Sequence, residues 1–276
     1  MNRGTVNILE VIFLLGMFLA TSCAPKQIIL PQIQGRALTP EERQVIFNSL
    51  QEKFDAVQSA KILYDANFTN RDETQSLRLV AVFEKPEHLR LETFPDTSFL
   101  SLQLMVMNGT IVSLIDNTSH KAFLTNNAER LLRRFLKLPI GAADLIAILS
   151  GRISATDLKK MRSGENFNVY ANEELGRYLI SKGDGDIIWE VNKFSLQVED
   201  VVYRNIFNDE VILRAHCNDI INEGAIQMPS NINIEVPGER LQFDFKARTS
   251  RINQTIPENL FEVEIPSGFS VEVIDE

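Results

Sequence analysis

The sequence predicts a mainly β protein of the α+β class. Apolar and polar residues alternate with a period of two over many short stretches, which is the period of β-strands. The dipeptide Asn108-Gly109 lies between two β-rich runs and is a strong hairpin signal. Stretches with helical spacing precede and interrupt these strands. Together the three observations predict a sheet accompanied by a few helices.

The first 22 residues are predicted to be a signal peptide rather than part of the fold. Arg3 supplies a positive charge, and the apolar run from Val11 to Ala20 is too short to span a bilayer, which needs about 20 residues. Small residues, Ala20-Thr21-Ser22, then precede Cys23, which resembles the lipobox of bacterial lipoproteins. The resemblance implies cleavage before Cys23 and acylation of that cysteine, giving a durable membrane anchor. The alternative is an ordinary secretory signal followed by an incidental cysteine.

The residue after Cys23 bears on localisation. Ala24 stands where an aspartate marks inner-membrane retention in Gram-negative lipoproteins. Its identity therefore favours the periplasmic face of the outer membrane. Residues 23–38 are interpreted as a lipidated tether. Residues 39–276 are interpreted as a single domain, because no linker, repeat or break in composition divides them.

A helix is predicted at the start of this domain. Thr39 can cap it, Pro40 suits the first helical position, and Glu42 completes a capping box. Four apolar residues then recur at helical spacing: Ile46, Leu50, Phe54 and Val57.

Strands are predicted on both sides of a helical insertion. Those before it cover residues 60–68, 77–83, 89–91, 102–106, 111–115 and 121–125. Those after it cover residues 167–171, 178–182, 187–191, 196–205, 211–217, 231–236, 241–247 and 262–265. Several strands are partly apolar on both faces, so the second face is expected to be covered by helix or by lipid.

The insertion itself is predicted to contain three helices. Asn127 can cap the first, over residues 128–136. The second runs from Gly141 or Ala142 to Ser150, and Gly151 ends it. A short third helix is expected over residues 156–161.

Composition excludes several kinds of function. The formal net charge of −9 argues against a nucleic-acid partner, because phosphates require a basic surface. Three histidines and two cysteines make a metal cluster improbable, and no catalytic or cofactor motif is present, so we expect neither an enzyme nor a cofactor. With Cys23 lipidated, Cys217 has no partner. The alternation over residues 211–217 predicts a buried structural thiol there.

Two features exceed what an ordinary core requires. The segment Thr93–Leu100 is predicted to be a loop, yet it carries three large apolar residues: Phe94, Phe99 and Leu100. Such residues on a loop meet lipid or a partner unless they fold back onto the core. The first insertion helix carries Arg130, Arg133 and Arg134, which suit an acidic partner or anionic lipid head groups. The alternative is a solvated helix face.

The pattern resembles the LolB/LolA lipoprotein-localisation family over about residues 57–246. The features that carry the resemblance, in order, are Arg90-Leu91-Glu92-Thr93-Phe94-Pro95, the hairpin at Asn108-Gly109, Leu114-Ile115-Asp116 and the helical hairpin Leu131–Leu149 closed by Gly151. It implies an incomplete antiparallel β-barrel of about 11 strands with helices capping its concave apolar face, between which acyl chains bind. The segment from Ile256 to Pro266 is more like LolA and related carriers, so a sibling that carries another lipid is the alternative to a LolB receptor.

The resemblance also implies a function and its residues. It implies a monomeric, non-enzymatic lipoprotein that binds acyl chains and assists insertion of lipoproteins or lipids into the outer membrane, with a periplasmic LolA-type carrier as partner. Phe94, Phe99 and Leu100 would then be the membrane-insertion tip. The side chains expected to line the acyl cavity are Ile62, Tyr64, Phe68, Leu79, Phe83, Leu91, Leu104, Leu114, Leu132, Phe135, Leu145 and Trp189. The same residues would suit an ordinary core, and an adaptor lipoprotein that binds a protein partner is the alternative function.

Overall fold

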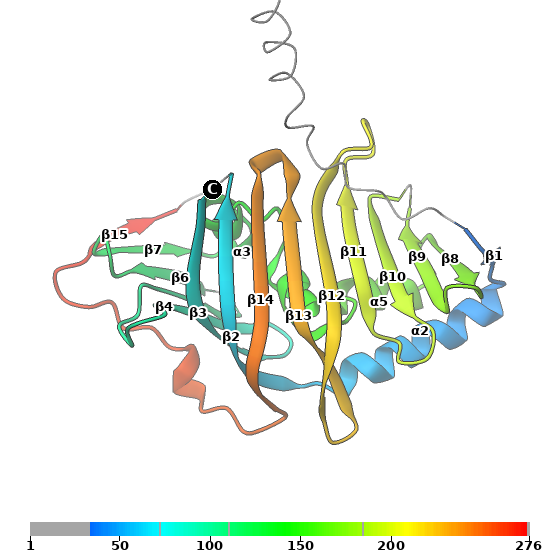
Figure 1. The fold of residues 1–276 in the computed structure, drawn as a ribbon, viewed down its shortest axis with the longest axis horizontal. Helices are drawn as coiled ribbons and strands as arrows, with labels where there is room; N and C mark the ends of the chain where they lie inside the picture. The colour runs from blue at the N-terminus through cyan, green and yellow to red at the C-terminus, as the bar shows by residue number, and fades with distance from the viewer. Residues whose placement is uncertain (1–33, 72, 110, 184, 275–276) are drawn as a thin grey trace, which may run out of the picture. The chain divides into compact units, whose positions relative to one another are not determined.

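The strands join into one long open sheet (Figure 1). The computed structural model describes residues 34–274 apart from residues 72, 110 and 184. Within these residues the sheet has 15 strands in the order β1-β8-β9-β10-β11-β12-β13-β14-β2-β3-β4-β5-β6-β7-β15. The strands are β1 (Arg36–Ala37), β2 (Ser59–Asn70), β3 (Glu73–Glu84), β4 (His88–Pro95), β5 (Gln103–Asn108), β6 (Ile111–Asp116), β7 (Lys121–Thr125), β8 (Phe167–Asn172), β9 (Arg177–Lys182), β10 (Ile187–Asn192), β11 (Val198–Arg204), β12 (Val211–Glu223), β13 (Ile226–Val236), β14 (Leu241–Ile252) and β15 (Ser270–Val273).

The helices pack on one face of this sheet. They are α2 (Pro40–Asp55), α3 (Ala128–Leu131), the π-helix η1 (Leu132–Leu136), α4 (Ala142–Ser150), α5 (Ala155–Arg162) and the short 3₁₀ turns η2 (Pro237–Glu239) and η3 (Glu258–Phe261). Helix α4 packs against β13, and α2 packs against α5. The main hydrophobic core lies between these helices and the sheet. The predicted fold class is confirmed: a mainly β, incomplete antiparallel barrel with helices on its concave face (Figure 1).

The predicted helix ends are confirmed at atomic level. Thr39 accepts a hydrogen bond from the Glu42 amide at 3.3 Å, and Glu42 accepts one from the Thr39 amide at 2.9 Å. Asn127 caps α3 in the same way. Gly151 ends α4 with a φ of 64°, and a Cβ atom there would lie 2.8 Å from Gln197 Nε2. That close approach explains why this position requires glycine.

One predicted helix differs in kind. Residues 128–136 form a single α-helical turn followed by η1. The π-helix ends at Lys137, whose φ is 55°. Because π-helical turns are rare and often occur at functional sites, this stretch is a candidate part of a functional site.

The C-terminal segment corrects one prediction. Residues 262–265 were predicted to be a strand but are not one, and β15 instead pairs with β7 in parallel, the one parallel pairing in the described sheet. Phe261 on η3 packs against the outer face of β3 and β5. The residues of this second cluster are Val80, Val82, Leu104, Val106, Ile256, Phe261 and Val263. This cover explains why β3 and β5 are apolar on both faces.

The sheet also extends beyond the predicted domain start. Arg36 and Ala37, which the sequence assigns to the tether, pair with Ala171 and Tyr170 of β8. The described sheet, with β1 and β15 at its edges, has 15 strands, more than the about 11 that the resemblance implies. The predicted signal peptide, Cys23 and most of the tether lie outside the described residues.

A charged cluster crosses strands β11 and β12. Both oxygens of the buried Asp200 accept a 2.8 Å hydrogen bond from Arg214, and Oδ2 also lies 2.9 Å from His216 Nδ1. The hydrogen bond to Asp200 raises the pKa of His216. Burial raises the pKa of Asp200, but the hydrogen bonds from Arg214 and His216 outweigh burial and lower it overall.

These shifts predict a dependence of stability on pH. A raised folded-state pKa means that the His216⁺–Asp200⁻ pair stabilises the fold below the unfolded pKa of about 6.5, and that this contribution is lost as pH rises through the folded pKa. Because the His216 side chain is 43% exposed, the loss should stay below about 1 kcal/mol. The free energy of unfolding, measured with urea at pH values between about 5.5 and 8.5, should change less with pH for His216→Gln than for the wild type. The same dependence on pH in both proteins would contradict a stabilising His216⁺–Asp200⁻ pair.

Candidate functional site

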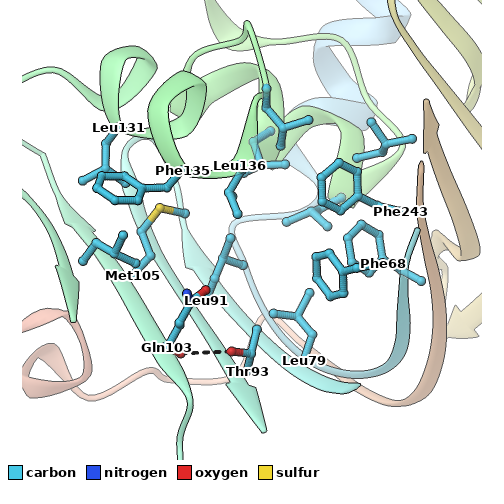
Figure 2. A pocket seen from close by; sticks show the side chains of 16 residues that line it. Phe68, Leu79, Leu91, Thr93, Gln103, Met105, Leu131, Phe135, Leu136 and Phe243 are labelled. Atoms are coloured by element: carbon cyan, nitrogen blue, oxygen red, sulfur yellow. Dashed lines mark hydrogen bonds between the residues drawn. The ribbon is translucent and has the colours of Figure 1, made fainter. Parts of the chain in front are cut away.

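An apolar cavity lies between the concave face of the sheet and the helices α3 and η1 (Figure 2). Its volume is about 60 Å³. Strands β2–β6, β13 and β14 form its floor, and α3, η1, α4 and Leu138 form its roof. The lining side chains are Phe68, Leu79, Leu91, Thr93, Gln103, Met105, Leu114, Leu131, Phe135, Leu136, Leu138, Leu145, Leu149, Ile234, Phe243 and Phe245.

Register places the floor residues side by side. Leu91 of β4 lies opposite Met105 of β5, and Phe68 of β2 lies opposite Phe243 of β14. The Phe68 and Phe243 rings meet edge to face with centroids 5.1 Å apart. Because side chains alternate across a strand, each of these pairs faces the helices.

A wider groove of about 850 Å³ adjoins the cavity. Six side chains line both spaces: Phe68, Thr93, Gln103, Phe135, Leu136 and Phe243. Charged side chains line only the groove, namely Arg71, Glu73, Lys137 and Glu239. These six side chains therefore form the boundary between the cavity and the groove. The groove, which carries the charged side chains and is open to solvent, is the mouth of the cavity.

The π-helix η1 forms the part of the roof next to this mouth. Its Phe135 and Leu136 are half-buried and line both spaces, whereas Leu131 and Leu132 are fully buried. The Phe135 ring packs against Phe123 with centroids 4.4 Å apart. The roof is therefore anchored in the core at Leu131 and Leu132, and it is more exposed at Phe135 and Leu136.

Arg134 fastens the exposed end of η1. Its guanidinium lies 5.3 Å from the Phe135 ring centroid and 5.6 Å from that of Phe123. It also forms a 2.8 Å ion pair with Glu272 of β15. Arg133 pairs with Glu129 at 2.9 Å. Two of the three arginines predicted to form a head-group patch are therefore paired with carboxylates of the same chain.

The predicted cavity residues divide into three groups. Six line the cavity: Phe68, Leu79, Leu91, Leu114, Phe135 and Leu145. Five are buried elsewhere in the main core: Ile62, Tyr64, Phe83, Leu132 and Trp189. Trp189, for example, packs against Phe167 of β8, with ring centroids 6.2 Å apart.

Leu104 is a correction to the prediction. It lies on the opposite face of β5, in the cluster with Phe261, and Met105 lines the cavity instead. The alternation of β5 was assigned in the wrong phase because both of its faces are apolar. The sequence signals for Phe243 and Phe245 of β14, which also line the cavity, were present in the predicted strand 241–247 but were not used.

The predicted loop is exposed at its tip. Phe99 is 86% exposed and Leu100 is 78% exposed, so these two residues do not fold back onto the core. Phe94 instead lies within strand β4, one residue before its end, and is half-buried. The loop follows directly from the cavity boundary, because the Leu102 amide donates to the Thr93 carbonyl at 2.8 Å.

Arg78 holds this loop in place. Its guanidinium donates hydrogen bonds to the Pro95 carbonyl, at 3.1 Å, and to the Ser98 carbonyl. The same group lies 4.6 Å from the centroid of the Phe99 ring. Arg78 alternates with the cavity-lining Leu79 and so lies on the outer face of β3, where these contacts hold the exposed tip in a defined position.

Two further exposed phenylalanines were missed by the sequence analysis. Phe194 is 89% exposed and Phe207 is 91% exposed, each at a turn of the sheet. Their backbone amides donate to the side chains of Asn192 and Asn205, at 3.0 and 2.9 Å. The shared signal, an asparagine two residues before the phenylalanine, is typical of an Asx turn.

Cys217 is buried as predicted. Its Sγ atom lies 3.7 Å from the Ile148 carbonyl, and burial raises the pKa of the thiol to about 12. A protonated thiol at neutral pH is a poor nucleophile. The described residues contain no group of three or more side chains that could hold a metal ion. None of the helices described is long and apolar enough to cross a membrane.

Comparison with known proteins places the fold. No family model matches the sequence, and no curated protein matches it either. The fold is similar to a DUF1329 family protein from Desulfovibrio piger, with a TM-score of 0.56, 9% identity and coverage of 80% of this chain and 96% of that chain. It is also similar to a putative outer membrane lipoprotein-sorting protein domain from Vibrio parahaemolyticus, with a TM-score of 0.57, 10% identity and coverage of 81% and 97%.

A third similarity is weaker. A LolA superfamily protein from Nitrosomonas europaea matches with a TM-score of 0.48, 11% identity and coverage of 78% of this chain and 97% of that chain. The first two similarities show that this chain shares the fold of a putative outer membrane lipoprotein-sorting protein domain, in agreement with the fold that the sequence resemblance predicts. At 9 and 10% identity the first two similarities concern the fold alone.

Proposed function

We propose that this protein binds acyl chains in the apolar cavity and assists the insertion of lipoproteins or lipids into the outer membrane, to which a lipidated Cys23 anchors it. One observation carries the proposal: an apolar cavity adjoins a polar groove at Thr93 and Gln103, the two residues between which a loop with an exposed apolar tip runs. These three parts suit the tail of a lipid, its head group and the membrane that receives it.

Burial of methylenes supplies the affinity. Each methylene transferred from water contributes about 0.8 kcal/mol. The cavity of about 60 Å³ is smaller than the roughly 150 Å³ void that admits benzene in another protein. An acyl chain therefore enters only when part of the roof moves outward, and the structure represents the closed form.

The π-helix η1 is the part of the roof suited to move. Phe135 and Leu136 are half-buried, and Arg134 holds them through an ion pair to Glu272 in which both side chains are about half-exposed. Exposed ion pairs of this kind contribute no more than about 1 kcal/mol. An outward movement of Arg134, Phe135 and Leu136 therefore breaks few strong contacts, while Leu131 and Leu132 stay fixed in the core.

Release follows from competition between the cavity and a membrane. The bilayer accepts the whole acyl chain, so transfer is favourable when the membrane binds the chain better than the closed cavity does. Phe99 and Leu100 bring the mouth of the groove to the bilayer by burying their own apolar surface. A periplasmic carrier of the LolA type would supply the lipoprotein.

Mass spectrometry tests this proposal on the full-length protein. After extraction from membranes with a mild detergent, we expect a non-covalent acyl lipid adduct that added long-chain lipid displaces. The same preparation should take up a fluorescent acyl lipid with saturable binding. A protein that carries no adduct and takes up no fluorescent lipid would refute acyl binding, and a stoichiometric protein partner in its place would favour the adaptor alternative.

A further inference from the structure

Two polar side chains lie at the boundary between the cavity and the groove. Thr93 of β4 and Gln103 of β5 line both spaces, and they are the polar members of an otherwise apolar cavity lining. They lie opposite each other in the register of these strands. Figure 2 shows them next to each other at the edge of the cavity.

Their position follows a gradient along the strand pair. One step further into the cavity, Leu91 lies opposite Met105, and both are apolar. One step outward, the chain enters the loop that carries Phe99. The same order holds on β3, where Leu79 lines the cavity and Gln75 and Glu73 line only the groove. A lipid lying along this gradient would place its acyl chain in the cavity. The carbonyl that joins this chain to the head group would then lie beside Thr93 and Gln103.

Both side chains have hydrogen-bonding capacity to spare. The Thr93 hydroxyl donates to the Gln103 backbone carbonyl over 3.4 Å, a long bond that is readily exchanged. The Gln103 side-chain amide forms no hydrogen bond within the described residues, and in Figure 2 its amide end is directed toward Leu91. Two neutral donors, an amide N–H and a hydroxyl, are thus available at the boundary.

We infer that Thr93 and Gln103 form a carbonyl-binding collar, which donates hydrogen bonds to the ester or amide carbonyl that joins an acyl chain to its head group. This inference rests on the proposed acyl-binding function and adds the ligand class: acyl esters and amides rather than plain hydrocarbon or ether chains. Neutral donors match a neutral carbonyl, whereas the cations that would suit a phosphate, Arg71 and Lys137, lie in the outer groove. Gln103 is exposed and Thr93 is half-buried, so a carbonyl at the boundary would exchange hydrogen bonds with water for hydrogen bonds with these two donors.

A pair of matched ligands tests the collar in the full-length protein. 1-Hexadecanoylglycerol and its ether analogue 1-O-hexadecylglycerol differ in the carbonyl alone. We expect the wild type to bind the ester about fivefold more tightly than the ether, measured by displacement of a fluorescent acyl lipid. The corresponding N-hexadecanoyl amide should also bind more tightly than the ether. Tighter binding of the ester than of the amide indicates an O-acyl ligand, and the reverse order indicates an N-acyl ligand.

Three variants separate the collar from a general loss of binding. Gln103→Met and Thr93→Val approximate the shape of each side chain but remove its hydrogen-bond donor, so the ratio of ester affinity to ether affinity should fall toward one. Gln75→Met is the matched control, because Gln75 lines the groove but not the cavity, and it should keep the preference. Equal binding of ester and ether by the wild type, or equal loss of both in the variants, would overturn the collar. If neither ligand binds the wild type, the proposed function itself fails.

Discussion

Replacing Phe99 and Leu100 by serine should slow the transfer of a bound acyl lipid into vesicles by about 100-fold or more. Burying an exposed phenylalanine or leucine contributes about 1.5–3 kcal/mol each, and this pair supplies most of the apolar surface at the loop tip. The effect should fall on transfer rather than on binding, because neither residue lines the cavity. Stopped-flow fluorescence with the acyl lipid loaded on the protein measures the rate.

Phe207→Ser provides the matched control for this experiment. Phe207 is 91% exposed and lies on the turn between β11 and β12, far along the sheet order from the loop between β4 and β5. Neither variant should change the free energy of unfolding by more than about 0.5 kcal/mol, since the altered side chains are exposed. Equal slowing of transfer by Phe207→Ser would show that any exposed apolar turn suffices and would remove the special role of Phe99 and Leu100.

Filling the cavity should strongly weaken the binding of acyl chains. Met105 points into the cavity from the centre of β5, and a tryptophan there would occupy the space of about 60 Å³. We expect Met105→Trp to weaken acyl-lipid affinity about 100-fold, because a chain would have to displace a packed indole. Overpacking costs about 1–3 kcal/mol of stability, so urea unfolding must accompany the titration.

The neighbouring residue gives the control for this variant. Leu104 lies on the other face of the same strand, against Phe261, so Leu104→Trp adds the same side chain outside the cavity. It should leave acyl affinity within about twofold of the wild type while disturbing the second cluster. Loss of affinity in Leu104→Trp as large as in Met105→Trp would mean that the cavity is not where the chain binds.

Local signals in the sequence were sufficient for the elements of the fold. The Thr39 capping box and the Asn127 cap are each formed by hydrogen bonds between residues three positions apart, and Gly151 ends α4 through its left-handed backbone and its hydrogen bonds to the preceding helical turn. The Asn108-Gly109 hairpin joins β5 and β6 as expected. Features that depend on neighbours a few residues away could therefore be predicted.

The cavity itself depends on distant parts of the chain. Tyr64 and Phe68 lie on the same face of β2, yet Phe68 lines the cavity while Tyr64 is fully buried beyond it. Which stretch of a strand borders the cavity depends on where the helices lie along the curved sheet, and no local pattern specifies that. Leu104 shows the second limit: the C-terminal segment covers the outer face of β5, so alternation alone could not tell which face was inner.

The position of a bound acyl chain tests the account most directly. A long-chain glycerol ester with a photoreactive group at the end of its tail should be incubated with the full-length protein, irradiated and mapped by mass spectrometry. We predict labels on cavity side chains such as Met105, Leu114 and Phe135, and their loss when unlabelled ester is added in excess. Labels confined to the exposed turns at Phe194 and Phe207, or labels that excess ester does not reduce, would contradict acyl binding between the sheet and η1.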